Sequence, residues 1–265
     1  MSTSKGKHRI LITNDDGIHA PGIAALESIA RTFTDDVWVV APDQEKSGAG
    51  HSISITHPIR MRQLEARRFQ IAGTPTDCVL MALSQFMTDG PPTILLSGIN
   101  SGANLAEDVT YSGTIAAAME GTLLGIRSIA LSQIRALDGQ ADFATALRYA
   151  PSLLGSLLDL EDWPASSFIN INFPNCAPEA VRGVRLTSQG QRPPGAFGID
   201  ARIDARNQPY FWVKLSYPKG NEHTGTDLAA VAENVVSVTP IRMDFTDHDW
   251  KQRLGKLIPG GGAVR

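Results

Sequence analysis

Short β-branched runs alternate with longer segments of helical periodicity through the first two thirds of the chain. This alternation is typical of βαβ units, which build a parallel sheet covered by helices. The expected strands cover residues 9–13, 37–41, 93–97, 128–132 and 168–172, and the expected helices cover residues 22–32, 75–86, 113–125 and 142–158. Residues 52–72 read as a β-hairpin or meander outside this sheet. The pattern predicts an α/β fold with three layers around a mostly parallel, Rossmann-like sheet.

The chain changes character after residue 173. Pro, Gly, Arg and Asn become frequent, and the aromatic run 210–217 alternates as an exposed hairpin strand does. Thr226 is placed to cap a short helix over 227–233, and residues 235–239 predict a last strand that returns to the core. We therefore expect a core over residues 1–173, a small β-hairpin-rich appendage used for oligomerisation over 174–224, and a return helix and strand with a carboxy-terminal arm over 225–265.

The composition argues against several classes of partner. The formal net charge is -3 and no long stretch of Lys and Arg is present, which argues against a nucleic-acid polymer as the main partner. No run approaches the roughly 20 apolar residues that span a bilayer, and the first residues lack the apolar segment of a signal peptide. Cys78 and Cys176 lack the spacing of a zinc pair. We expect a cytoplasmic protein with free thiols and no membrane partner.

An acidic pair, Asp15 and Asp16, directly follows the first expected strand, and Gly17 lets the chain turn. In open α/β sheets, ligands bind at the carboxyl ends of the strands. Two adjacent acids repel each other there unless a cation or hydrogen-bond donors compensate, so a divalent ion would resolve the repulsion. An Asx-turn with a helix cap explains the same residues. On this motif alone the two interpretations are level.

The second expected strand also ends in a polar loop. This loop supplies Ser47, Gly48, Gly50 and His51. Small residues with free N–H groups and hydroxyls can form a concave anion-binding surface. The loop alone is a weak signal, because Ser and Gly are ordinary loop residues.

The third expected strand ends in an asparagine-rich loop that contains Asn100 and Asn104. The loop leads through Ser112, Gly113 and Thr114 into an Ala-rich helix. A helix N-terminus of this kind binds phosphate, because its N–H groups lack partners and the helix dipole favours an anion. All three loops should converge on one edge of a parallel sheet. Carboxylate, amide and hydroxyl oxygens suit magnesium or manganese better than zinc or copper.

Six blocks then occur in a recognisable order: TNDDGI, APDQEKSGAGHSIS, GTPTDCV, SGINSGANLAEDVTYSGTIAAAMEG, INFP and GTDLAAVAENVVSVTP. Together they resemble the signature blocks of the SurE (survival protein E) family of 5'/3'-nucleotidases, over about residues 9–244. The resemblance implies a metal-dependent phosphomonoesterase that holds one divalent ion per subunit, Mg²⁺ or Mn²⁺. Carried across by motif, the metal ligands are Asp15, Asp16, Ser47 and Asn100.

The resemblance also implies a substrate and an assembly. The substrates are nucleoside 5'- and 3'-monophosphates, and whether short polyphosphate is hydrolysed stays open. The assembly is a homodimer or homotetramer with exchanged carboxy-terminal segments, and residues 247–249 read as a polar turn near that arm. The chain departs from the family pattern at Ser101 and Ala106, where Arg and Gly are frequent. This difference bears on substrate preference rather than on the metal site.

A mechanism follows as a hypothesis. Asp15 or Asp16 orients or deprotonates the attacking water beside the ion. His51 is the candidate for protonating the leaving oxygen, although a lone His is more often structural. The candidates to hold the phosphate are Asn104, Ser112, Gly113 and Thr114.

Two alternatives stay open. A covalent mechanism would phosphorylate Ser47 or Asp15, although the DxD spacing of aspartyl-phosphate enzymes is absent. A non-catalytic nucleotide-binding module could use the same sheet, but the GxGxxG fingerprint after the first strand is missing. Two acids stand in its place, and they would repel a pyrophosphate unless a cation lay between them.

Overall fold

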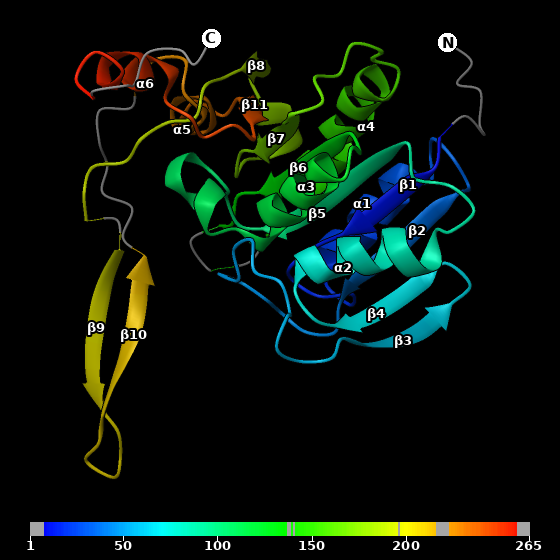
Figure 1. Ribbon diagram of the computed structural model, residues 1–265, viewed down its shortest axis with the longest axis horizontal. Helices are drawn as coiled ribbons and strands as arrows, with labels where there is room; N and C mark the ends of the chain where they lie inside the picture. The colour runs from blue at the N-terminus through cyan, green and yellow to red at the C-terminus, as the bar shows by residue number, and fades with distance from the viewer. Residues whose placement is uncertain (1–7, 137–138, 140, 196, 216–222, 259–265) are drawn as a thin grey trace.

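The computed structural model describes residues 8–136, 139, 141–195, 197–215 and 223–258. Within these residues, a nine-stranded sheet has the order β3-β4-β2-β1-β5-β6-β7-β11-β8. Its central, parallel strands are β1 (Ile10–Thr13), β2 (Val37–Pro42), β5 (Ile94–Ser101), β6 (Ser128–Gln133) and β7 (Ser167–Phe173). Helices cover both faces of this sheet (Figure 1). The predicted three-layer, mostly parallel α/β fold is confirmed.

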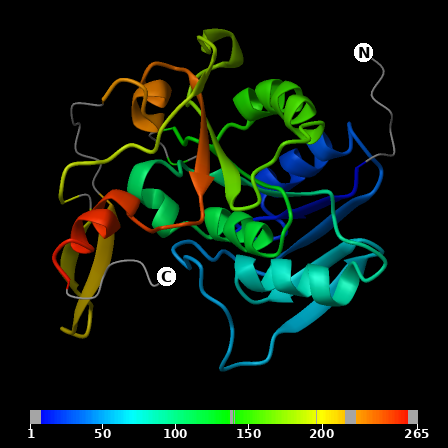
Figure 2. The same cartoon turned by 45° about the horizontal axis from the view of Figure 1, so that its top comes forward.

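Each face of the sheet is buried by a different pair of helices (Figure 2). One pair is α1 (Pro21–Ala30) with α4 (Ala144–Leu158), and the other is α2 (Pro75–Met81), continued by the π-helical turn η1 (Ala82–Phe86), with α3 (Gly113–Leu123). Ile12 of β1 packs in the cluster of the first pair, whereas its neighbour Leu11 packs in the cluster of the second. Successive strand side chains point to opposite faces. A strand buried on both faces therefore reads as a continuous apolar run.

The hairpin expected within residues 52–72 exists, but its predicted position outside the sheet is wrong. It consists of β3 (Arg60–Glu65) and β4 (Arg68–Ala72), which pair in antiparallel fashion. β4 also pairs with β2 in parallel and extends the main sheet. Phe69 and Ile71 are buried in the same apolar cluster as the α2 side chains. Burial of these two side chains explains why the hairpin lies against the core.

The region after residue 173 divides between two sheets. β11 (Val236–Arg242) pairs antiparallel with β7 and parallel with β8 (Val184–Leu186), so it returns to the core as predicted. The strands β9 (Phe197–Ile203) and β10 (Pro209–Leu215) form a separate two-stranded hairpin that stands away from the main sheet (Figure 1). Tyr217, at the end of the predicted hairpin strand, lies outside the described residues.

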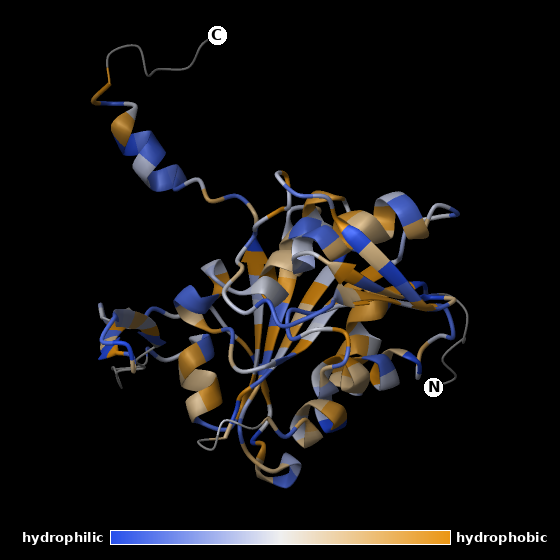
Figure 3. Cartoon of the chain, turned by 90° about the horizontal axis from the view of Figure 1, so that it is seen from below, coloured by the Kyte–Doolittle hydropathy of each residue, from blue (hydrophilic) through white to orange (hydrophobic). Residues whose placement is uncertain are grey.

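Two short helices complete this region. α5 (Asp227–Ala232) begins after Thr226, whose hydroxyl accepts a hydrogen bond from the Ala229 N–H, as predicted. α6 (His248–Leu254) replaces the polar turn expected over residues 247–249, because Asp247 caps the helix by accepting a hydrogen bond from the Trp250 N–H. Figure 3 shows α6 standing away from the main body. No helix in the described part of the chain is long and apolar enough to cross a membrane.

Candidate functional site

The sheet changes its winding direction at β1, which lies between β2 and β5. Ligand sites of open α/β sheets lie at the carboxyl ends of the strands beside such a reversal. Asp15 and Asp16 follow β1 after one residue, and Asn100 lies near the end of β5. Thr13 and Ser97 are directly paired between the two strands. The acid pair and Asn100 therefore lie at one edge of the sheet.

Asp15 is a buried carboxylate held by the first turn of α3. It accepts a hydrogen bond from the Thr114 hydroxyl, and the backbone N–H groups of Gly113 and Thr114 also stabilise its charged form. Ser112 caps the same helix by accepting a hydrogen bond from the Ile115 N–H at 3.1 Å. Burial raises the pKa of Asp15, and the α3 donors oppose that rise. Two of the residues predicted to hold phosphate, Gly113 and Thr114, thus contact Asp15, and a third, Ser112, directly precedes them.

The close approach of Asp15 to α3 depends on Gly113. A Cβ atom at this position would lie 2.8 Å from the Asp15 Cβ and 3.1 Å from the Pro75 Cγ. Both distances are shorter than ordinary carbon contacts. Glycine is therefore required if the helix N-terminus is to reach the carboxylate.

Asp16 is half-buried and faces the end of β5. Its Oδ2 accepts a hydrogen bond from the Ser101 N–H at 2.9 Å. Burial, together with the negative charge of Asp15, raises the pKa of Asp16 to about 6, and the Arg135 guanidinium opposes the rise. A cation beside the pair would favour the charged form of both acids.

The loop after β2 is attached to both neighbouring loops. The Lys46 N–H donates to the Asp15 carbonyl at 2.7 Å, and the Gly50 N–H donates to the Tyr111 carbonyl at 3.1 Å. Ser47 follows Lys46 directly, is exposed, and donates its hydroxyl hydrogen to Glu45 at 2.8 Å. The Ser47 hydroxyl is therefore anchored one residue from a backbone contact with Asp15.

Asn100 is half-buried, and its side chain has a defined orientation. The amide nitrogen donates to the Gly102 carbonyl at 3.0 Å, which leaves the side-chain oxygen to act as a ligand. The pairing of β5 with β6 shifts between Ser97 and Asn100. Ser101, the next residue, contacts Asp16. The strand end thus brings an amide oxygen to the neighbourhood of the acid pair.

These donors fit a hard divalent cation. Two carboxylates, a hydroxyl and an amide oxygen are the groups that magnesium and manganese prefer. Asn14 adds a buried side-chain oxygen that no described residue hydrogen-bonds, and its side-chain nitrogen donates to the Gly17 carbonyl. Within the described ranges, no group of three or more His, Cys, Asp and Glu side chains could hold a metal. A cation at this edge would therefore depend on neutral oxygens in addition to the two acids.

Asn104 is buried within a network of polar side chains. Its side chain donates to the Ser132 hydroxyl at 2.7 Å, and its carbonyl accepts hydrogen bonds from Asn170 and Asn172. The side chain is 4% exposed. This network fixes the asparagine-rich loop on β6 and β7, and a direct contact of Asn104 with phosphate stays a prediction.

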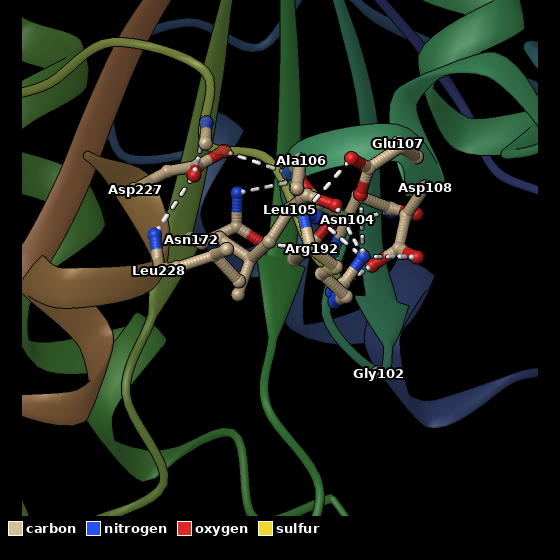
Figure 4. Close-up of polar contacts among 12 residues, drawn as sticks. Gly102, Asn104, Leu105, Ala106, Glu107, Asp108, Asn172, Arg192, Asp227 and Leu228 are labelled. Carbon is tan, nitrogen blue, oxygen red and sulfur yellow. Dashed lines mark hydrogen bonds and ion pairs between the residues drawn. The ribbon is translucent and has the colours of Figure 1, made fainter. Parts of the chain in front are cut away.

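The same loop is held from its other side by the carboxy-terminal part of the chain (Figure 4). Arg192 donates to both carboxylate oxygens of Asp108, at 2.9 and 2.8 Å, and to the Leu105 carbonyl. Asp227 is fully buried and accepts hydrogen bonds from the N–H groups of Ala106 and Gly190. We call Arg192 and Asp227 the loop clamp.

The family model described as "Survival protein SurE" matches residues 10–195. The chain belongs to the SurE family. A protein of Methylorubrum extorquens (strain PA1) with the name "5'-nucleotidase SurE" is 52% identical over 241 residues, which cover 90% of this chain and 94% of that protein. One of Brucella suis (strain ATCC 23445 / NCTC 10510) with the same name is 50% identical over 253 residues, covering 94% and 98%.

A solved SurE structure has the same fold. The crystal structure of the SurE protein from Aquifex aeolicus superposes with a TM-score of 0.81 at 36% sequence identity. The superposed region covers 94% of this chain and 99% of the Aquifex aeolicus chain. The SurE family match includes all four predicted metal ligands. The SurE-like fold predicted from the sequence is thereby confirmed.

Sequence reasoning missed three residues of this SurE site. Arg135 follows β6 and donates to the Ser101 carbonyl, so its positive charge lies near Asp16. Arg192 lies in a stretch without a matched family block, and Asp227 lies in the block GTDLAAVAENVVSVTP. An acid at the first position of the predicted helix 227–233 is ordinary, so its place in a family block is the only sequence signal for Asp227. No comparable signal marks the two arginines.

Proposed function

We propose that this chain is a divalent-metal-dependent nucleotidase that hydrolyses nucleoside monophosphates to nucleoside and phosphate. The observation that carries the proposal is the position of the acid pair at the reversal of the sheet, with Asp15 against the N-terminus of α3 and Asp16 at the end of β5. The names of the relatives, "5'-nucleotidase SurE", support a 5'-phosphate substrate. Activity on 3'-monophosphates rests on the family resemblance of the sequence.

The two acids have different roles in this proposal. Asp15, Asp16, Ser47 and Asn100 would hold one divalent ion per subunit, Mg²⁺ or Mn²⁺. When bound, such an ion would lower the pKa of a water and offset charge on the phosphate. Asp15 is a fixed ligand, because Thr114 and the α3 backbone hold its carboxylate. Asp16 is half-buried and uses one oxygen to accept from Ser101, so its second oxygen is the better placed base for the attacking water.

The phosphate is held beside Arg135 and the Ser112–Thr114 entry into α3. The Gly113 and Thr114 N–H groups already stabilise Asp15, and the Ile115 N–H donates to Ser112. The helix dipole and the Arg135 guanidinium, rather than free N–H groups, therefore attract the anion. His51 lies with its Nε2 2.9 Å from a carboxylate oxygen of Glu120, and this contact holds the imidazole in place. A protonated His51 would donate to the oxygen of the leaving nucleoside.

A covalent route is the second candidate, because the Ser47 hydroxyl donates to the Glu45 carboxylate at 2.8 Å. A serine paired with a base is the usual arrangement of an activated nucleophile. Hydrolysis in ¹⁸O-labelled water with a chiral phosphate separates the two routes. Direct attack by water inverts the configuration at phosphorus, whereas a phosphoserine intermediate retains it.

We also propose a cytoplasmic homodimer or homotetramer. Exposed apolar side chains are concentrated on the hairpin β9–β10, with Phe211 63% exposed and Trp212 59% exposed, and on the carboxy-terminal arm around Trp250. Surfaces of this kind mark protein interfaces. Exchange of the arm between subunits would bury α6, which has no buried residue in the single chain.

Phosphate release from a panel of phosphomonoesters tests the proposed function. The purified protein is expected to hydrolyse nucleoside 5'-monophosphates, to lose this activity with a chelator, and to regain it with Mg²⁺ or Mn²⁺. The panel also ranks 3'-monophosphates and short polyphosphate against the 5' substrates. Nucleotide binding without phosphate release under every metal would favour a non-catalytic nucleotide-binding module instead.

A further inference from the structure

We infer that an apolar cavity beside α3 receives the base of the nucleotide. The inference rests on the proposed nucleotidase function and extends it to the recognition of the substrate. The cavity has a volume of about 130 Å³, and it is continuous with the candidate site because His51 and Ser112 are among its lining residues. Its apolar lining includes Val109, Ala116, Met119, Phe168, Ile241 and Phe245.

The cavity runs along α3, away from the end that holds Asp15. Ser112, Ala116 and Met119 are spaced by four and three residues, so they share one face of the helix. At about 1.5 Å per residue, Met119 lies roughly 10 Å along the axis from Ser112. A phosphate bound at the N-terminus of α3 would therefore have its sugar and base directed along this face.

The side chains of the cavity suit a flat aromatic group. Phe168 is fully buried and belongs to an apolar cluster against which Met119, Ile241 and Met243 pack. Phe245 also lines the cavity and is 78% exposed. Phenyl rings and methionine sulfur both make favourable contacts with aromatic rings. A phosphate or an unsubstituted sugar has no apolar face to place there, which leaves the base as the part of the substrate that fits.

The same lining predicts how selective the site is. The polar lining side chains are His51, Thr110, Ser112 and Arg242. Thr110 already donates to the Glu107 carbonyl, and Ser112 caps α3. A mainly apolar pocket discriminates weakly between similar groups, because it leaves few buried polar partners unsatisfied. We expect the presence of a base to affect turnover far more than its identity.

Two variants change the cavity without changing the acid pair. Ala116→Met fills it from the helix, and Phe245→Ala removes an aromatic ring that is already exposed, so its folding risk is small. Leu123→Ala is the matched control, because Leu123 lies at the far end of α3 and is 60% exposed. The substrates are adenosine 5'-monophosphate and ribose 5-phosphate, which share the scissile bond and differ in the base. Adenosine binding is measured separately by calorimetry.

The expected result is a loss of activity on the nucleotide but not on the base-free phosphate. kcat/KM for adenosine 5'-monophosphate should fall about tenfold in both cavity variants, with ribose 5-phosphate changed less than about twofold. Leu123→Ala should leave both values unchanged. Equal losses for both substrates, or an unchanged value for the nucleotide, would overturn the inference. If the wild-type protein releases phosphate from neither compound, the nucleotidase proposal fails. The calorimetric affinity for adenosine then tests the base-binding role of the cavity by itself. Weaker adenosine binding in both variants would support that role, and wild-type affinity would overturn it.

Discussion

Asp16 shares its surroundings with a second carboxylate, and its pKa is raised to about 6 by burial and by Asp15. A carboxyl whose folded pKa exceeds its unfolded value near 3.8 costs stability once it ionises. The cost is absent below about pH 4 and complete above about pH 6. In chelator-treated protein, Asp16→Asn should therefore raise Tm at pH 8 and raise it less at pH 5, as measured by calorimetry. Asp35→Asn, at an exposed position, is the control.

With added metal, the wild-type protein should have a higher Tm than Asp16→Asn, the reverse of their order in chelator. A ligand that binds only the folded state raises Tm with its concentration. The wild-type protein should gain Tm with millimolar Mg²⁺ or Mn²⁺ at pH 8, because the ion can bind both carboxylates. Asp16→Asn should gain much less, since one charged ligand is missing. An equal gain in both proteins would show that the ion binds elsewhere.

Gly113 provides a second residue-level test. Ala at this position places a Cβ 2.8 Å from that of Asp15, so the helix or the carboxylate must shift. We expect Gly113→Ala to cost roughly 1–3 kcal/mol of unfolding free energy, as overpacking does, and to weaken metal binding in a calorimetric titration. Gly155→Ala is the matched control in α4, because its added Cβ meets only Phe33 at an ordinary 3.5 Å. Undiminished metal affinity in Gly113→Ala would contradict the described packing.

The individual residues differ in how far the sequence predicts them. The position of Asp15 and Asp16 at a strand end is predictable, because an apolar run directly precedes them, but a metal site and an Asx-turn explain the acid pair equally well until the neighbouring loops are considered. The contact of Asp15 with Thr114 joins residues 99 positions apart, and it depends on where α3 begins in space. Arg135 becomes a site residue only because β6 ends beside β5. No local pattern contains that information.

At the level of whole elements, the loop clamp links the carboxy-terminal region to the asparagine-rich loop. The Arg192 side chain is 7% exposed and makes two hydrogen bonds to Asp108. Arg192→Ala leaves this mostly buried acid without its cation, and we expect a loss of roughly 3 kcal/mol in unfolding free energy. Arg202→Ala, which removes an exposed ion pair with Asp200, should change stability by less than about 1 kcal/mol. Chemical denaturation measures both.

The elements themselves were predictable where the apolar periodicity is strong. The central strands and the four large helices are of this kind. β8 has only three residues, and none of them is buried, so the sequence carries no apolar pattern for this strand. Its pairing with β11 is what makes it a strand. The pairing of β4 with β2 was also missed, because a hairpin signal specifies its own two strands and not the neighbour of the pair.

The whole molecule leaves its apolar hairpin uncovered. Phe211, Trp212 and Val213 are consecutive and each more than half exposed, so both faces of β10 are apolar. We expect Trp212→Asp to shift the assembly toward a smaller species in light scattering after size-exclusion chromatography. Ile55→Asp, an exposed apolar position on the main body, should leave the mass unchanged. A single-chain mass for the wild-type protein would contradict the proposed assembly.

The most direct test of the proposed metal centre is anomalous diffraction from crystals grown with Mn²⁺. The expected result is one strong peak per subunit within bonding distance of oxygen atoms of Asp15 and Asp16, with Ser47 and Asn100 completing the protein ligands. A protein crystallised with millimolar Mn²⁺ that shows no peak at this edge of the sheet, or a peak only at another site, would contradict it.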